Sequence, residues 1–174
     1  GNPYMSTPQV LSDFLSTYPK SPFRETIESF LVDSYISSKN YKEALSLLES
    51  NMRNALKPSY QKVAFFRALE FFNNADFSSA QPLLKKAITL GVDPVITARA
   101  TYWNAEIEFL NLNFEDALQY FLIFKNSSKA SQSLEHNHLN YNLGYTYFKL
   151  KQYSKAITAF QSYVSNSEES KSYI

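Results

Sequence analysis

The residues best suited to metal or acid–base chemistry in this 174-residue chain are its two histidines and a pair of glutamates. His136 and His138 are two positions apart, and on a helix such side chains point about 200° away from each other. They therefore cannot hold one metal ion as an i, i+4 pair does. Glu106 and Glu108 share this spacing, so they do not form a catalytic carboxylate pair. We expect no catalytic site, no metal site and no cofactor, and hence a protein that is not an enzyme.

The composition excludes several other classes of function. The chain has no cysteine, which rules out thiolate ligands and cysteine nucleophiles, and its three glycines leave no room for a phosphate-binding loop. Seventeen basic and sixteen acidic residues give a net charge of +1, too balanced for binding nucleic acid through bulk charge. No apolar run approaches the roughly 18 residues of a membrane span. We therefore expect a protein or peptide partner, no nucleic acid, and no direct membrane span.

Aromatic side chains recur at a spacing that places them on one face of a helix. In three stretches of the chain, large side chains follow one another at i, i+4 and i+7, which coincide on a helical surface. Aromatic rings suit a binding surface because they cover a large area with little rotamer entropy to lose. The alternative is that they only stack against neighbouring helices. The nine candidates for a ligand groove are Phe65, Leu69, Phe72, Tyr102, Glu106, Phe109, Tyr141, Tyr145 and Phe148.

Groove binding makes a specific prediction about exposure. Phe65, Tyr102, Tyr141 and Phe148 should then keep part of their rings accessible on one concave surface. The equivalent positions of an earlier stretch are smaller and more polar, namely Ser29, Asp33 and Ile36.

A motif that recurs four times indicates how these faces are positioned. It consists of a polar residue, an aromatic residue, two further residues and an alanine, and its alanines are separated by 36, 37 and 39 residues. Three copies begin with Asn or Asp, which are good helix N-caps, so each motif is predicted to open a helix. The four copies are Asn40-Tyr41-Lys42-Glu43-Ala44, Asp76-Phe77-Ser78-Ser79-Ala80, Asn113-Phe114-Glu115-Asp116-Ala117 and Gln152-Tyr153-Ser154-Lys155-Ala156.

A second helical stretch precedes each motif and is joined to it by two or three residues. A link that short makes the two helices an antiparallel hairpin. Pro22, Pro58 and Pro94 fall near the start of the first helix of a hairpin, where a missing N–H costs little. The alanines, Ala80 and Ala117 above all, should be buried between the two helices. The predicted helices span 7–17, 23–38, 41–54, 59–73, 77–90, 95–111, 114–126, 132–150 and 153–166.

These elements predict an all-α solenoid of four helical hairpins preceded by one orphan helix. The repeats span 23–57, 58–93, 94–130 and 131–166, residues 1–22 are the end of a truncated repeat plus a linker, and 167–174 are a tail. We expect the chain to be a piece of a longer protein. Its end helices then expose apolar patches. The fragment is expected to self-associate through these patches, or Tyr173-Ile174 folds over one of the patches. The patches consist of Leu11, Phe14 and Leu15 at one end and Ala159, Phe160, Tyr163 and Val164 at the other.

The fourth unit carries the residues of a known family. Leu143-Gly144-x-x-Tyr147 followed by Ala156-x-x-x-Phe160 resembles the tetratricopeptide repeat (TPR), and the other three units match more loosely. The resemblance implies a right-handed α-α superhelix whose concave groove binds peptides. The carboxylate clamp of one subgroup uses lysines and asparagines at the groove positions. Phenylalanine, tyrosine, leucine and acids stand there instead, so an apolar segment is the expected ligand.

A finer resemblance concerns location. Phe14-Leu15-x-x-Tyr18-Pro19-x-Ser21-Pro22 and Tyr102-Trp103-x-Ala105-Glu106 resemble repeats of Gram-negative envelope proteins, of the Tol–Pal-associated coordinator and outer-membrane-assembly lipoprotein types. This implies a non-catalytic scaffold in the periplasm or at the outer membrane. Three alternatives remain open: a regulatory or sensory segment of a larger signalling enzyme, a purely structural spacer, and a cytoplasmic location.

Overall fold

The structure, a computed structural model, describes residues 6–50 and 54–171, with side chains up to Ser165. Within these ranges all regular structure is helical, which confirms the all-α prediction. The α-helices are α1 (Thr7–Thr17), α2 (Arg24–Ser37), α3 (Tyr41–Ser50), α4 (Lys57–Asn73), α5 (Phe77–Leu90), α6 (Pro94–Leu110), α7 (Phe114–Asn126), α8 (His136–Lys149) and α9 (Tyr153–Lys171), with short 3-10 turns at Asn54–Leu56 and Ala130–Gln132. None of the described helices is long and apolar enough to cross a membrane.

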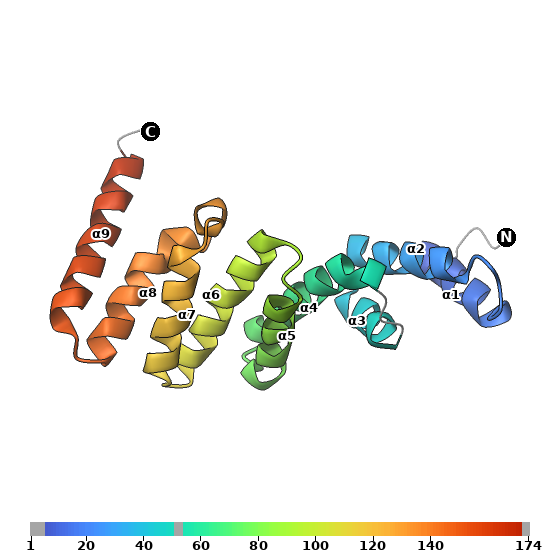
Figure 1. The fold of residues 1–174 in the computed structure, drawn as a ribbon, viewed down its shortest axis with the longest axis horizontal. Coiled ribbons are helices and arrows are strands. Elements are labelled where there is room, and N and C mark those ends of the chain that lie inside the picture. The colour runs from blue at the N-terminus through green and yellow to red at the C-terminus, as the bar shows by residue number, and fades with distance from the viewer. Residues whose placement is uncertain (1–5, 51–53, 172–174) are drawn as a thin grey trace.

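The helices follow one another in a row from one end of the molecule to the other (Figure 1). Each packs against its neighbours in sequence, and α2/α3, α4/α5, α6/α7 and α8/α9 are antiparallel hairpins. The first helices of successive hairpins also touch, α2 with α4 and α4 with α6, while α1 packs on α2. This arrangement is an α-solenoid of four hairpins after a single helix, as predicted.

All four hairpins turn through the same backbone conformation. The residue five positions before each motif alanine has a positive φ of 58° to 65°. The next amide donates to a carbonyl five residues earlier, as Asp76 N does to Phe71 O at 2.9 Å. These are the bonds of a helix C-terminus closed by a left-handed residue. The residues that take this conformation are Lys39, Ala75, Leu112 and Lys151.

Polar side chains start some helices as predicted and not others. Asp76 caps α5 by accepting a hydrogen bond from Ser79 N at 3.1 Å. Asn113 stands at the N-cap of α7 as predicted, but its side chain makes no capping hydrogen bond. The Asn113 side chain donates instead to Glu108 Oε2 at 2.9 Å, because a buried carboxylate on the partner helix competes for it.

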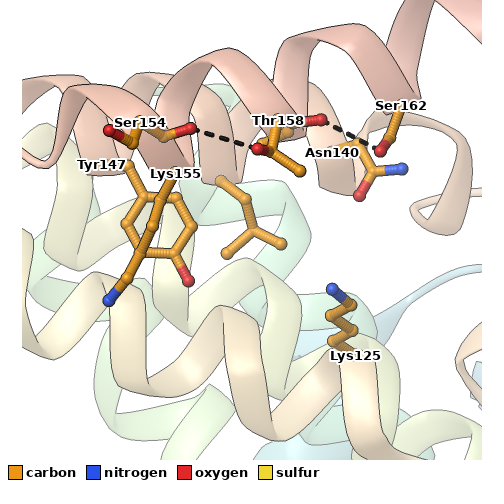
Figure 2. Close-up of a pocket in the computed structure, with 9 residues that line it drawn as sticks. Lys125, Asn140, Tyr147, Ser154, Lys155, Thr158 and Ser162 are labelled. Carbon is orange, nitrogen blue, oxygen red and sulfur yellow. Dashed lines mark hydrogen bonds between the residues drawn. The ribbon is translucent and has the colours of Figure 1, made fainter.

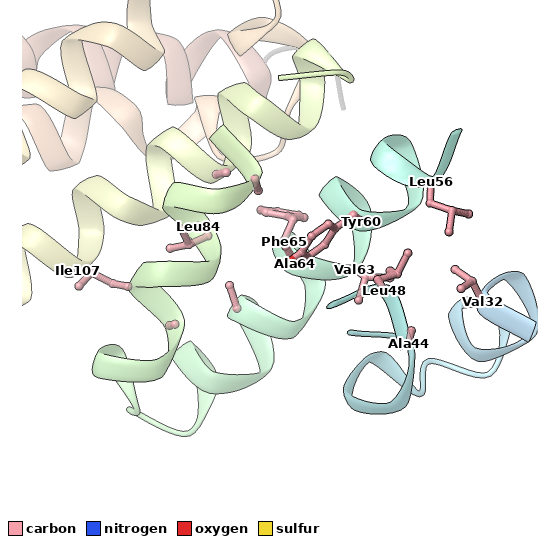
Figure 3. Packing of buried hydrophobic residues seen from close by; sticks show 14 residues of the cluster. Val32, Ala44, Leu48, Leu56, Tyr60, Val63, Ala64, Phe65, Leu84 and Ile107 are labelled. Carbon is pink, nitrogen blue, oxygen red and sulfur yellow. The ribbon is translucent and has the colours of Figure 1, made fainter. Parts of the chain in front are cut away.

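Small residues let the two helices of each hairpin approach closely. Ala80 and Ala117 are fully buried, as predicted, and Ala44 and Ala156 are buried as well. The facing positions, twelve residues earlier, are also buried, being Val32, Ala68, Ala105 and Gly144. The apolar core therefore extends along the row of helices, and Figure 3 shows its first half, from Val32 to Ile107.

Three predicted boundaries differ from the structure. Helix α3 is described up to Ser50, the predicted helical residues 51–53 lie outside the described residues, and Asn54 belongs to a 3-10 turn. Helix α8 begins at His136 and not at 132, because a 3-10 turn and the buried Glu135 precede it. Helix α9 continues to Lys171, so most of the predicted tail is helical.

The end helices expose fewer of the predicted apolar residues than expected. Val164 is 51% exposed, as predicted, and Ile157 is also exposed. Ala159 is buried, however, and Phe160 and Tyr163 are partly buried against tyrosines of α8. At the other end Leu15 is buried, while Leu11 and Phe14 are half-buried. Tyr173 and Ile174 lie outside the described residues, and self-association stays a prediction.

Candidate binding groove

The nine predicted groove residues lie on α4, α6 and α8, and their exposure increases along the chain. On α8 the side chains of Tyr141, Tyr145 and Phe148 are exposed, at 42%, 41% and 51%. Leu69, Phe72, Glu106 and Phe109 are half-buried. Phe65 and Tyr102 are buried, at 0% and 4%, so the prediction of partly exposed rings is wrong for these two and correct for Tyr141 and Phe148.

Phe65 is covered by the next repeat, and Tyr102 is covered by the second helix of its own hairpin. The guanidinium of Arg99, on α6, covers the Phe65 ring at 4.9 Å from its centroid. The Tyr102 ring packs between Phe121 and Phe124 of α7, at centroid distances of 5.6 and 5.2 Å. Both residues therefore belong to the core, where stacking on neighbouring helices is the correct interpretation.

The exposed candidates gather around a pocket of about 410 Å³ between α6 and α8, which we call the α6–α8 pocket. Four of the predicted residues line it, and its full lining is Glu106, Phe109, Leu110, Phe121, Tyr141, Asn142 and Tyr145. Leu69, Phe72 and Phe148 lie outside this lining, and Phe72 stacks on Trp103 at 4.8 Å instead. A groove role for any of the nine residues stays a prediction.

A hydrogen-bonded group stands on one side of the pocket. The Asn142 Nδ2 group, which has two hydrogens, donates to Glu106 Oε1 and to the Tyr102 hydroxyl oxygen, the latter at 2.7 Å. Tyr102 and Glu106 are also hydrogen-bonded to each other. Burial raises the pKa of Glu106 above its usual range, although these two hydrogen bonds oppose the shift. Burial and the Glu106 charge likewise raise the pKa of Tyr102, which stays a neutral hydroxyl.

Two tyrosines of α8 form an aromatic wall of the pocket. The rings of Tyr141 and Tyr145 are 4.8 Å apart. Helix α9 supports them from behind, because Phe160 packs on Tyr145 at 5.3 Å and Tyr163 packs on Tyr141 at 5.4 Å. The wall is thus held in place by another hairpin helix and needs little ordering when a ligand binds.

A second hollow, of about 310 Å³, lies among α7, α8 and α9 and is more polar (Figure 2). Two of its hydroxyls are used within α9, since Ser162 donates to Thr158 O and Thr158 donates to Ser154 O. The Lys155 ammonium donates to Gln152 Oε1 at 2.9 Å. Its lining holds none of the nine predicted groove residues.

Two residues near the α6–α8 pocket, Asn142 and Glu135, could not be identified from any local signal in the sequence. Asn142 follows Glu106 by 36 residues, and Glu135 follows Arg99 by the same number, so only the stacking of repeats brings each pair together. Glu135 is buried and accepts from Arg99 Nε and from Trp103 Nε1, both at 2.9 Å. These bonds join the start of α8 to α6.

Comparison with known families supports the predicted architecture. Two family models described as tetratricopeptide repeat match the chain, one over residues 67–131 and the other over residues 138–170. A search of curated proteins finds no match. The chain therefore carries tetratricopeptide repeats over more than half of its length, from within α4 to α9.

Proposed function

We propose that this protein is a non-catalytic scaffold that binds an apolar segment of a partner protein in the α6–α8 pocket. Tetratricopeptide repeats generally mediate protein–protein interactions, and this supports the general class of function. The observation that carries the location is the exposure of Tyr141 and Tyr145, about two-fifths of each side chain, beside a pocket of about 410 Å³.

The chemistry of the lining favours a particular kind of segment. Phe109, Leu110 and Phe121 give the pocket an apolar floor, and the tyrosine rings add area that stays rigid on binding. An extended or helical segment that carries apolar side chains matches this surface. A C-terminal carboxylate does not, because Glu106 stands in the lining and repels a negative charge.

Peptide selection on the purified protein tests the groove while the partner is still unidentified. A random peptide library displayed on phage is selected on the natural chain, and the enriched peptides are then measured against variants. Tyr145→Ala should weaken binding at least about tenfold, as loss of an aromatic anchor does. Tyr18→Ala is the matched control, since Tyr18 is an exposed tyrosine at the end of α1.

Two results would contradict the groove. Enriched peptides that bind Tyr145→Ala as tightly as the natural chain place the binding surface elsewhere, and a failure to enrich any peptide favours the structural spacer. Tyr102 is unsuitable for this test because it is part of the core, and truncating it would destabilise the fold.

We further propose that the chain is part of a longer scaffold of the Gram-negative cell envelope. The support is the resemblance of the Phe14–Pro22 and Tyr102–Glu106 phrases to repeats of envelope proteins. Fractionation of cells that express the full-length protein should find it in the periplasm or with the outer membrane. A full-length sequence with an appended catalytic domain would instead support the signalling enzyme.

A further inference from the structure

Buried or half-buried glutamates in the described part of the chain are paired with basic residues, with one exception. Glu28 pairs with Arg24 at 2.9 Å, Glu135 with Arg99 at 2.9 Å, and Glu108 with Lys85 at 3.9 Å. Each of these pairs lies within the solenoid, so the protein itself compensates the charge of a carboxylate that has lost much of its water.

Glu106 is the exception. It is half-buried and lines the α6–α8 pocket, and its neighbours Asn142 and Tyr102 are neutral hydrogen-bond donors. No lysine, arginine or histidine of the described residues forms an ion pair with it. The pocket therefore presents one negative charge that the solenoid leaves uncompensated, and complementary charge in a ligand would be positive.

The aromatic lining suits one kind of cation in particular. A planar guanidinium stacks on aromatic rings while its N–H groups hydrogen-bond a carboxylate, whereas an ammonium acts as a point charge. This fold already contains such contacts, with the Arg67 guanidinium 4.1 Å from the Phe71 ring centroid and that of Arg99 4.9 Å from the Phe65 centroid. Phe109, Tyr141 and Tyr145 offer equivalent ring surfaces beside Glu106.

We propose that the α6–α8 pocket takes an arginine side chain of the partner segment, whose guanidinium pairs with Glu106 and lies against the tyrosine wall. This inference rests on the proposed function, because it names what the same pocket selects. Asn142 and Tyr102 are positioning residues, which hold the carboxylate in place through their hydrogen bonds. Apolar side chains that flank the arginine would contact Phe109 and Leu110.

Two capped tripeptides test the charge requirement directly. One is acetyl-Leu-Arg-Leu-amide, and the other carries citrulline in place of arginine, which keeps the shape and removes the charge. Each is titrated into isotopically labelled protein while amide chemical shifts are recorded. We expect the arginine peptide to shift signals from α6 and α8 and to bind at least about tenfold more tightly than the citrulline peptide.

A pair of variants isolates the carboxylate. Glu106→Gln should reduce binding of the arginine peptide to the level of the citrulline peptide, because glutamine keeps the size of the side chain and loses the charge. Glu115→Gln removes a charge from an exposed position on α7 and should leave binding unchanged. Thermal unfolding of both variants at a temperature no lower than that of the natural chain would show that neither effect comes from misfolding.

The outcomes separate this inference from the proposed function. Equal binding of both peptides at α6 and α8, or unchanged binding to Glu106→Gln, would overturn the arginine preference and leave groove binding standing. If neither peptide shifts these signals while phage-selected peptides do, the arginine preference is again wrong. If no peptide of either kind binds there, both proposals are wrong.

Discussion

The ring of Phe160 on α9 occupies the space directly over Gly144 on α8. A β-carbon placed on Gly144 would lie 2.5 Å from Phe160 Cε1 and 2.6 Å from Cδ1, well inside van der Waals contact. The ring has little freedom to move, because it also packs on Tyr145 at 5.3 Å and Tyr141 at 6.2 Å. The close approach of the last two helices and the tyrosine wall of the pocket thus depend on the same contact.

Gly144→Ala should therefore destabilise the protein, although alanine favours a helix over glycine by about 1 kcal/mol. Overpacking costs about 1–3 kcal/mol, so we expect a net loss of about 1 kcal/mol in the free energy of unfolding, measured by urea denaturation. In a Phe160→Leu background the same substitution should become stabilising, because the smaller side chain leaves room. A stabilising effect of Gly144→Ala in the natural chain would show that the ring yields.

The sequence was sufficient to predict the elements and their order because they depend on local signals. The buried alanines recur with the period of the repeat, and Pro94 lies at the start of α6 as predicted. The same periodicity identified Tyr141, Tyr145 and Phe109, which do lie at the pocket.

Exposure could not be predicted from the same periodicity. Phe65 and Tyr141 have equivalent positions in their repeats, yet the first is buried and the second is 42% exposed. Arg99 from the following repeat covers Phe65, whereas the described part of the chain places no further repeat after α9. Burial at these positions depends on the neighbouring repeat, which a single repeat does not encode.

Asn104 carries a polar side chain into a position where the first and fourth repeats have Leu31 and Leu143. It is completely buried on α6, and neither its Nδ2 nor its Oδ1 atom has a hydrogen-bond partner among the described residues. Such a group costs about 1–3 kcal/mol. Asn104→Leu, similar in shape, should raise the free energy of unfolding by about 1 kcal/mol in urea denaturation. A loss of stability would indicate that Asn104 has a partner in solution.

Leu112 adopts a conformation that favours glycine at the turn between α6 and α7. Its φ is 65°, and 70% of its side chain is exposed, so little packing is lost on replacement. Leu112→Gly should raise the thermal midpoint and stabilise the fold by about 0.5 kcal/mol, because the left-handed conformation strains a leucine. Gln119→Gly, in the middle of α7 where the backbone is helical, should instead cost about 1 kcal/mol. Equal effects of the two substitutions would contradict a left-handed turn at Leu112.

Because of Glu135, the free energy of unfolding should decrease as the pH becomes acidic. Burial raises the pKa of its carboxyl, but hydrogen bonds from Arg99, its own backbone and Trp103 outweigh burial and hold the pKa below its usual range. The stabilisation is present above the unfolded pKa of about 4.3 and is lost as pH falls through the lower folded value. Glu135→Gln should cost about 2 kcal/mol at pH 7 and flatten this acid loss in urea denaturation. Glu115→Gln, at an exposed position, is the control that should change neither.

Glu106 should have the opposite effect, because its contribution to the free energy of unfolding decreases as the pH rises. An experiment can therefore distinguish the two carboxylates. Burial raises its folded pKa despite the hydrogen bonds from Tyr102 and Asn142, so its stabilisation is present below about pH 4.3 and is lost as pH rises through the folded value. Glu106→Gln should therefore be more stable than the natural chain at pH 7, and the two should differ less at pH 4. Urea denaturation at both pH values measures this difference.

A variant that is less stable at pH 7 would show that the carboxylate is compensated within the solenoid, and it would remove the charge argument for an arginine ligand. A variant that gains stability and loses the arginine peptide would show that the pocket keeps a destabilising charge in order to bind.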